Sequence, residues 1–212
     1  MKLIDYSVLD FVKELDSAKP APGGGSASAV AAALGMALSR MVGHLTISKK
    51  KFKALDDYAQ ESFIDIHEQL KDNQRKALKL VDEDTLAFNQ IMKAFKMPKE
   101  SNEEKKERKK AIEKATYKAT EVPLEIAEIS FETLKKLQQT LKHANKNAIS
   151  DIGVSALLLH SALEGAILNV KINLPGISDE SYKEKTVAKV KSMQQEGHVV
   201  KEALLKMVNE HL

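Results

Sequence analysis

The sequence predicts an all-α protein: a single-domain bundle of long antiparallel helices with two central helices made of small residues. Only 5% of the 212 residues are aromatic and none is Trp, whereas Ala, Leu, Lys and Glu, which favour helices over strands, are abundant. Apolar residues recur at steps of three and four, the helical period, along most of the chain. Because no repeat or linker divides residues 1–212, one helical domain is expected.

The N-terminal quarter predicts two helices separated by a turn. Apolar residues three apart from Leu3 to Leu15 indicate a first helix, which the prolines at 20 and 22 end. A glycine turn at 23–25 follows, and a helix of small residues then runs to about Leu45. Helices that are small and apolar on all sides usually lie in the centre of a bundle, where backbones approach closely.

The middle of the chain predicts two long helices. Residues 52–95 contain no Pro or Gly and carry one apolar seam, in which Asp84 occupies a position that otherwise holds a hydrophobic residue. The mixed charges of SNEEKKERKK are typical of a solvated helix face. A second apolar stripe continues through Pro123, which has no N–H for the carbonyl of Ala119 and therefore predicts a kink.

The C-terminal third predicts a second helix of small residues and a final amphipathic helix. Asn147 is a cap candidate for the first of these, which the Pro-Gly pair at 175–176 ends. Ser178 is the cap candidate for the last helix. Two helices of small residues can cross closely.

Composition and charge exclude several classes of function. With 33 basic and 30 acidic residues the net charge is +3, which does not indicate a nucleic-acid-binding face. The absence of Cys excludes disulfides, thiol nucleophiles and Cys-type zinc sites, and the six His show no metal-binding spacing. The apolar stretch 27–39 is too short for a membrane span and no signal peptide is evident, so a cytoplasmic protein is expected.

Some residues could serve either structure or chemistry. The turn at 23–25 with Ser26 is either a tight turn or a set of backbone amides that receives an anion or a polarised carbonyl. Asp84 on its apolar seam is either a hydrogen-bonded structural carboxylate or a working one. Asn147 and Asp151 fit a helix first turn, and Lys49 fits a helix C-terminus, without further function.

Four blocks in the same order resemble the cyclodeaminase/cyclohydrolase family of folate enzymes. The blocks are PGGGSASAVAAALGMALSRMVGHLTISKK, DEDTLAFNQIMKAFKMPK, KATEVPLEIAE and NAISDIGVSALLLHSALEGAILNVKINL. The resemblance implies an all-helical homodimer that acts on the carbon bridging N5 and N10 of tetrahydrofolate. The substrate is the folate derivative itself, and no metal or further cofactor is implied.

The resemblance also assigns roles to residues at matching positions. It implies catalytic roles for Asp84, Asp151 and Lys49, with Lys49 meeting the glutamate tail or donating a proton. It implies substrate binding by the polar and turn residues Gly23, Gly24, Gly25, Ser26, Asn147 and Asn169. Ser48, where Gly is common, and Lys171, where Arg is common, depart from the family pattern and put neighbouring roles in doubt.

The expected activity is methenyltetrahydrofolate cyclohydrolase, which hydrolyses 5,10-methenyl-tetrahydrofolate to 10-formyl-tetrahydrofolate. The 212 residues leave no room for the formiminotransferase domain that often accompanies the deaminase of the family. The alternative is formiminotetrahydrofolate cyclodeaminase, an ammonia-lyase that forms the methenyl compound. A second alternative is a non-catalytic helical binding module, against which the carboxylate of Asp84 on an apolar seam argues.

Overall fold

The computed structural model describes residues 2–212, and every regular element in them is helical, which confirms the predicted all-α architecture. The helices are α1 (Val8–Leu15), α2 (Gly24–Ile47), α3 (Lys50–Lys53), α4 (Asp57–Phe95), α5 (Asn102–Thr140), α6 (Ile149–Asn173) and α7 (Glu180–Asn209). Short 3-10 turns lie at Leu3–Asp5, Leu141–His143, Lys146–Ala148 and Leu174–Gly176.

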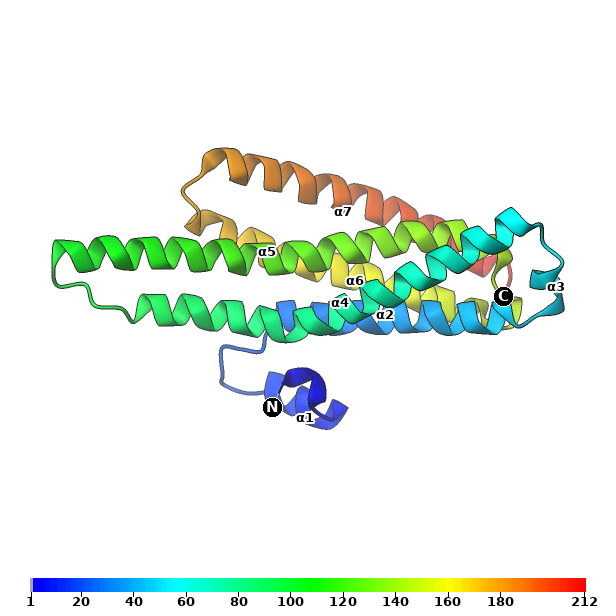
Figure 1. The fold of residues 1–212 in the computed structure, drawn as a ribbon, viewed down its shortest axis with the longest axis horizontal. Helices are drawn as coiled ribbons and strands as arrows, with labels where there is room; N and C mark the ends of the chain where they lie inside the picture. Colours follow the sequence, from blue (N-terminus) through cyan, green and yellow to red (C-terminus); the bar gives the residue numbers. More distant parts are fainter. Residues whose placement is uncertain (1) are drawn as a thin grey trace.

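Helices α2, α4, α5 and α6 form an antiparallel bundle, and α7 packs on α5 and α6 (Figure 1). The hairpin between α4 and α5 extends well beyond the other helices at one end, while α3 and the start of α6 lie at the opposite end (Figure 1). As a result, the two ends of α2 lie in different parts of the molecule.

Helix ends follow local capping chemistry, with small differences from the sequence-based expectations. The Asp56 side chain accepts the Ala59 N–H and starts α4, so Phe52 lies in the separate helix α3 rather than in the long helix. Asp179, not Ser178, caps α7, because its carboxylate accepts the Tyr182 N–H. A side chain that accepts the free N–H of the residue three positions later is the usual cap at the N-terminus of a helix.

Small residues bring α2 and α6 into close contact. Gly35 has no room for a Cβ beside Leu159, and the hydroxyls of Ser39 and Ser155 lie 2.7 Å apart between the helices. Each helix nevertheless keeps one face uncovered, since only 44% and 50% of their most apolar windows are buried. Both helices therefore belong to the core on one side only.

The apolar windows of α2 and of Lys146–Gly176 are also longer than the 13-residue stretch found in the sequence. By length and composition alone, both segments could cross a membrane, with a mean hydropathy of 1.4. This is weak evidence, because core helices of globular proteins have the same property. In this fold the buried side of each helix forms the bundle core.

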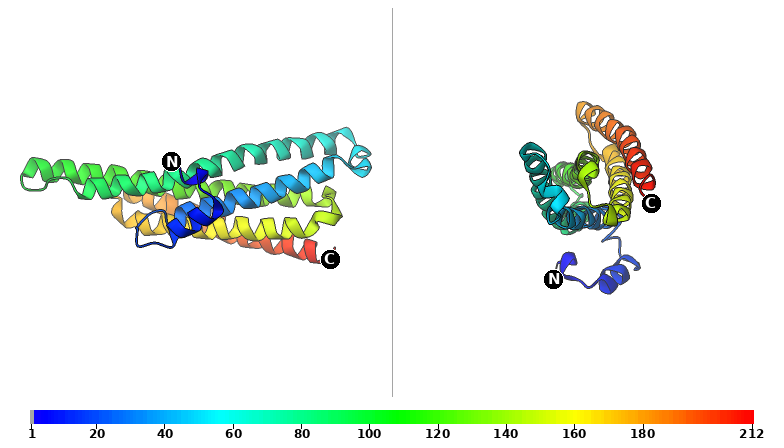
Figure 2. Two further views of the ribbon diagram at one scale, coloured as in Figure 1. Left: turned by 90° about the horizontal axis from the view of Figure 1, so that it is seen from below. Right: turned by 90° about the vertical axis from the view of Figure 1, so that its right-hand side faces the viewer.

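The N-terminal segment, with α1, lies on the outside of the bundle (Figure 2). No residue of α1 is buried, and Val8 is 84% exposed. The segment is fixed at its start, where the Leu3 N–H donates to Asp82 Oδ1 at 2.6 Å. Leu3 and Phe11 also pack against the bundle core, whereas Val8, Leu9 and Val12 remain exposed in the single chain.

Candidate functional site

A cavity of about 270 Å³ lies at the N-terminal end of α2, and we call it the carboxylate cavity. The glycine turn, α4, α5 and the end of α6 all contribute to its wall. It is lined by Pro20, Ala21, Gly23, Gly24, Gly25, Asp84, Phe88, Ala119, Asn169, Ile172 and Asn173. Asp84 is the single charged side chain among these residues, so the chemistry of the cavity centres on one carboxyl group.

Gly25 makes room for the Asp84 carboxyl group. A Cβ at position 25 would collide with all three terminal atoms of the Asp84 side chain. Gly25 is itself buried in the first turn of α2, where helix backbone amides are free. The glycine is required for this close approach and not for an unusual backbone angle, because no glycine in residues 2–212 has a positive φ.

Ser26 fixes the position of the same carboxyl group from one residue further along α2. Its fully buried hydroxyl lies 2.8 Å from the Val81 carbonyl and 3.1 Å from Asp84 Oδ2. It is also 3.1 Å from the Thr85 hydroxyl. A hydroxyl has one proton, so Ser26 donates to either the carbonyl or the carboxylate, and Thr85 can donate to Ser26 in return.

The environment of Asp84 favours its neutral form. Burial raises the pKa of the Asp84 carboxyl above its usual range, and the hydrogen bonds from the Ser26 side chain and backbone only partly oppose this shift. A carboxyl group with a raised pKa accepts a proton more readily near neutral pH than an exposed Asp does. Asp84 is therefore suited to proton transfer.

Asn169 faces the glycine turn from α6. A Cβ on Gly24 would lie 3.1 Å from Asn169 Nδ2, which itself donates to the Gly165 carbonyl at 2.8 Å. Asp84, Asn169, Ser26 and the glycine turn thus come together, although 143 residues separate Ser26 from Asn169.

Asn173 is a site residue that the sequence analysis missed. Its side-chain amide donates to the Ala119 carbonyl at 2.7 Å and to the Asn169 carbonyl at 3.0 Å. The Ala119 carbonyl is the one that Pro123 leaves without a helical partner. Pro123 shows from the sequence alone that the Ala119 carbonyl lacks a helical donor. That missing donor was the signal that could have led to Asn173.

Three of the predicted site residues lie far from Asp84 in the same chain. Lys49 and Asn147 line a different cavity, of about 550 Å³, at the C-terminal end of α2. Asp151 lies nearby in sequence, in the first turn of α6. Because 24 residues of α2 rise about 1.5 Å each, the two ends of the helix are about 36 Å apart.

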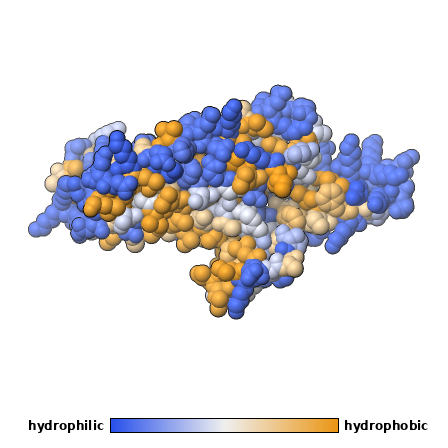
Figure 3. All heavy atoms as spheres, turned by 180° about the vertical axis from the view of Figure 1, so that it is seen from behind, coloured by the Kyte–Doolittle hydropathy of each residue, from blue (hydrophilic) through white to orange (hydrophobic). Residues whose placement is uncertain are grey.

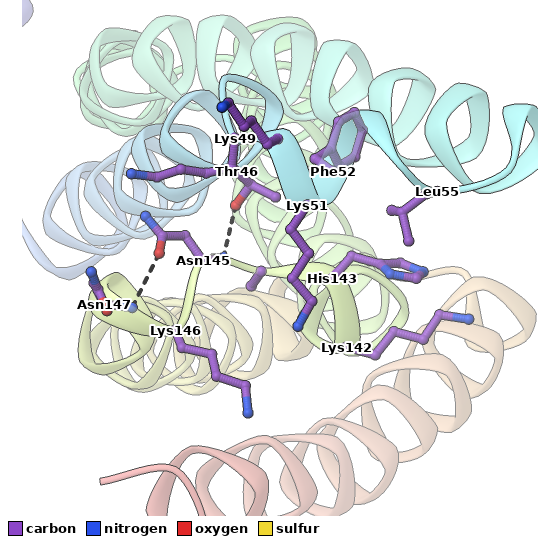
Figure 4. Close-up of a pocket in the computed structure, with 12 residues that line it drawn as sticks. Thr46, Lys49, Lys51, Phe52, Leu55, Lys142, His143, Asn145, Lys146 and Asn147 are labelled. Atoms are coloured by element: carbon purple, nitrogen blue, oxygen red, sulfur yellow. Dashed lines mark hydrogen bonds between the residues drawn. The ribbon is translucent and has the colours of Figure 1, made fainter.

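The cavity around Lys49 is rich in positive charge, and we call the residues Lys49, Lys50, Lys51, Lys142, His143 and Lys146 the basic end. Lys51 extends from α3 toward the segment that carries Lys142 and Lys146 (Figure 4). The Thr46 hydroxyl accepts the Asn145 N–H at 2.9 Å, and the Asn145 side chain accepts the Asn147 N–H at 3.2 Å. Burial and the neighbouring Lys142 lower the pKa of His143.

Among residues 2–212, no three His, Asp or Glu side chains gather closely enough to hold a metal ion. The two cavities instead offer a half-buried acid at one end of α2 and an anion-attracting surface at the other.

Residues 7–192 match the family model described as formiminotransferase-cyclodeaminase. This chain belongs to that family. Its formimidoyltransferase-cyclodeaminase relative from Mus musculus is 36% identical over 195 residues, which are 92% of this chain but 35% of the relative. The chain thus spans about a third of that protein, and the family resemblance seen in the sequence is confirmed.

Two further relatives match over nearly their full length. Methenyltetrahydrofolate cyclohydrolase from Methylorubrum extorquens is 32% identical over 93% of both chains. The crystal structure of formiminotetrahydrofolate cyclodeaminase from Thermotoga maritima has a TM-score of 0.79 and 26% identity, and the match covers 98% of this chain and 96% of that one. Relatives of about this length are therefore named either as a cyclohydrolase or as a cyclodeaminase.

Proposed function

We propose that this chain is a methenyltetrahydrofolate cyclohydrolase. The end-to-end match with the Methylorubrum extorquens enzyme, 32% identical over 93% of both chains, carries the proposal. The carboxylate cavity supports it, since an acid of raised pKa lies among backbone amides and apolar walls. A cytoplasmic location, in keeping with the absence of Cys, is part of the proposal.

The proposed reaction needs one proton acceptor beside the bridging carbon. The oxygen of water bonds to the methenyl carbon while Asp84 accepts a proton from that water. The bond from this carbon to N5 then breaks, N5 keeps the proton of the new hydroxyl group, and the formyl group stays on N10. Over one turnover one proton leaves to solvent, and no reactant beyond water and the folate derivative is required.

Each residue has a specific part in the proposed step. The Asp84 carboxylate faces the cavity and, when ionised, also attracts the positively charged methenyl bridge. Ser26 holds that carboxylate in place, and Gly24 lets the backbone approach the ligand beside Asn169. These positions combine an oriented base with walls that carry no other charged side chain, which strengthens its attraction for the bridge.

Cyclodeaminase activity is the second candidate, and the Thermotoga maritima structure favours it because that chain of matching extent is named as a cyclodeaminase. In that reaction N10 attacks the formimino carbon, Asp84 takes the proton from N10 and returns it to the leaving ammonia. The same site geometry serves both reactions, so assays must separate them.

Two assays on the purified protein test the proposal. With methenyl-tetrahydrofolate, we expect the near-ultraviolet absorbance to fall faster than the spontaneous rate. With 5-formimino-tetrahydrofolate, a cyclodeaminase would instead raise that absorbance and release ammonia. Acceleration of the second reaction alone would replace the proposed activity by the second candidate. Acceleration of neither would support the non-catalytic binding module.

A further inference from the structure

Two backbone carbonyls fix the orientation of the Asn173 side-chain amide. Its nitrogen donates to the Ala119 carbonyl at 2.7 Å and to the Asn169 carbonyl at 3.0 Å, which accounts for both of its N–H groups. The reversed amide would place the side-chain oxygen against these two carbonyl oxygens, and none of the three carries a hydrogen. The nitrogen is therefore committed to the backbone, and the oxygen is the part of the amide that remains for a ligand.

Pro123 is the reason that one of these carbonyls needs a side-chain donor. In a regular helix the Ala119 carbonyl accepts the N–H of the residue four positions later, and proline has none. Any other residue at 123 would supply an N–H that competes with Asn173 for this carbonyl, and the amide would be held less firmly. Pro123 thus acts on the carboxylate cavity through Asn173, although it does not itself line the cavity.

The Asn173 oxygen is open to the cavity. Asn173 is half-buried and lines the cavity wall. Within residues 2–212 no donor reaches this oxygen, and the oxygen is not closed off from solvent. A fixed amide oxygen of this kind accepts a hydrogen from a ligand and offers none in return.

Most of the cavity wall is apolar. Pro20, Ala21, Phe88 and Ile172 contribute to it, and Ile172 is 76% exposed. Apolar residues also cover much of the bundle and of the N-terminal segment on the side seen in Figure 3. In a cavity with few polar groups, those few determine which way a ligand lies.

Asn173 and Asp84 lie at separate points of the cavity. Helices α2 and α6 are antiparallel, with Gly24 beside Asn169, and the Asp84 carboxyl lies beside Gly25. Asn173 follows Asn169 by one helical turn, about 6 Å, and therefore lies beyond the start of α2. A ligand that reacts at Asp84 can place a second group at Asn173.

A tetrahydrofolate carries a donor that suits this second point. Its reacting bridge includes N5, an atom of the pteridine ring, so the ring enters the cavity together with the bridge. The cavity volume of about 270 Å³ is at the lower limit for drug-sized ligands and suits the ring better than a whole folate. The 2-amino group, at the end of the ring away from the bridge, carries two hydrogens, whereas the neighbouring ring carbonyl oxygen carries none.

We propose that the Asn173 side-chain oxygen accepts a hydrogen bond from the 2-amino group of the pteridine ring and so sets the direction in which the folate enters the cavity. This inference rests on the proposed folate activity. Asn173 binds the ring, Asp84 acts on the bridge, and Pro123 is a positioning residue that acts through Asn173. A ligand with a carbonyl oxygen in place of the amino group would bring two acceptors together and be rejected.

Binding of two ligands that differ only in this group tests the proposal. The ligands are 5-formyl-tetrahydrofolate and its analogue with hydrogen in place of the 2-amino group, each titrated calorimetrically into the purified full chain. The wild type should bind the amino ligand about tenfold more tightly, as expected for one neutral hydrogen bond. Asn173→Ala should reduce this preference to less than about threefold.

Two further variants separate recognition from folding. Pro123→Ala combined with Asn173→Ala restores an N–H for the Ala119 carbonyl, so this double variant keeps the fold where the single variant is unstable. It should show the same loss of preference. Ile172→Ala is the matched control, because it removes an apolar part of the cavity wall next to Asn173 and should weaken both ligands alike.

The outcomes separate this assignment from the proposed activity. Equal affinity of the wild type for the two ligands would overturn the assignment, and so would an unchanged preference in both Asn173 variants. A wild type with the expected preference but no turnover in either folate assay would contradict the proposed activity alone. A wild type that binds neither ligand would contradict the proposed folate function and this assignment with it.

Discussion

The two ends of α2 differ in how they handle charge. At the N-terminal end, one half-buried carboxyl group lies against Gly25 and is held by Ser26. At the C-terminal end, several lysines surround an open cavity and remain exposed. A single acid can be partly withdrawn from solvent because one glycine and one hydroxyl accommodate it, whereas a cluster of like charges must stay in solvent. The first arrangement suits chemistry on a bound carbon, and the second suits attraction of an anion.

The largest expected effect comes from Asp84→Asn at the N-terminal end. The change keeps the side-chain shape and removes its basicity, so turnover should fall by about 10²- to 10⁴-fold. Circular dichroism should show an unchanged helical fold. Glu83→Gln, one position earlier on α4, is the matched control and should keep normal activity. Normal turnover in Asp84→Asn would remove this residue from the proposed mechanism.

Gly25→Ala and Gly24→Ala separate packing from ligand contact at the same end of α2. The Cβ at position 25 collides with the Asp84 carboxyl, so we expect a stability loss of about 1–3 kcal/mol together with a large loss of turnover. Gly24 is exposed, and its Cβ meets only Asn169, so Gly24→Ala should weaken folate binding more than stability.

Thermal melting and Michaelis constants measured on both glycine variants test this difference. Gly35→Ala, in the middle of α2, is the control. Its Cβ meets Leu159 of α6, so the change should lower stability without changing the Michaelis constant. A Gly24→Ala variant with lower stability but normal binding would assign the turn to packing alone.

Asn173→Ala should remove the partner of the Ala119 carbonyl. An unpaired buried carbonyl costs about 1–3 kcal/mol, which denaturant unfolding can measure. Pro123→Ala restores an N–H four residues after Ala119, so the cost of Asn173→Ala should largely disappear in the double variant. An equal cost in both backgrounds would show that Asn173 acts through other contacts.

The smallest expected effect is the pH dependence of stability from Asp84. Its pKa is raised by burial in the folded chain but is ordinary in the unfolded chain, so the folded state binds more protons between the two values. Stability from this group is therefore present at low pH and is lost as the pH rises through the folded pKa. Asp84→Asn should gain stability relative to wild type over the same rise.

Melting temperatures of both proteins across this pH range provide the measurement. A constant difference between them would contradict the raised pKa of Asp84. The activity of the wild type should change in the opposite direction, decreasing as the pH falls and the carboxylate becomes protonated.

The sequence was sufficient to predict the helices, because their apolar periodicity and their Pro and Gly boundaries are local features. Asp84 was also found from such a pattern, as an acid on an apolar seam. The predicted site residues divide into two groups because α2 is one helix of 24 residues, a length that separates Gly24 from Lys49. Family resemblance placed these residues in one site without stating which chain each comes from.

Other parts of the site depend on distances between helices that no local pattern encodes. The collision of a Cβ at Gly25 with Asp84 requires α2 and α4 to pack at one particular register. The sequence also could not show which sides of α2 and α6 are uncovered. A helix that is apolar on all sides gives no indication of which side lacks a partner.

The bond from Asn173 to the Ala119 carbonyl also has an evolutionary consequence. The amide at 173 is needed for this purpose only while residue 123 is proline, because any other residue there supplies its own N–H. Selection on the two positions is therefore linked: a lineage that replaces Pro123 releases position 173 from this constraint, whereas one that loses Asn173 first must pass through a less stable intermediate. Across related sequences, we expect residues 123 and 173 to vary together.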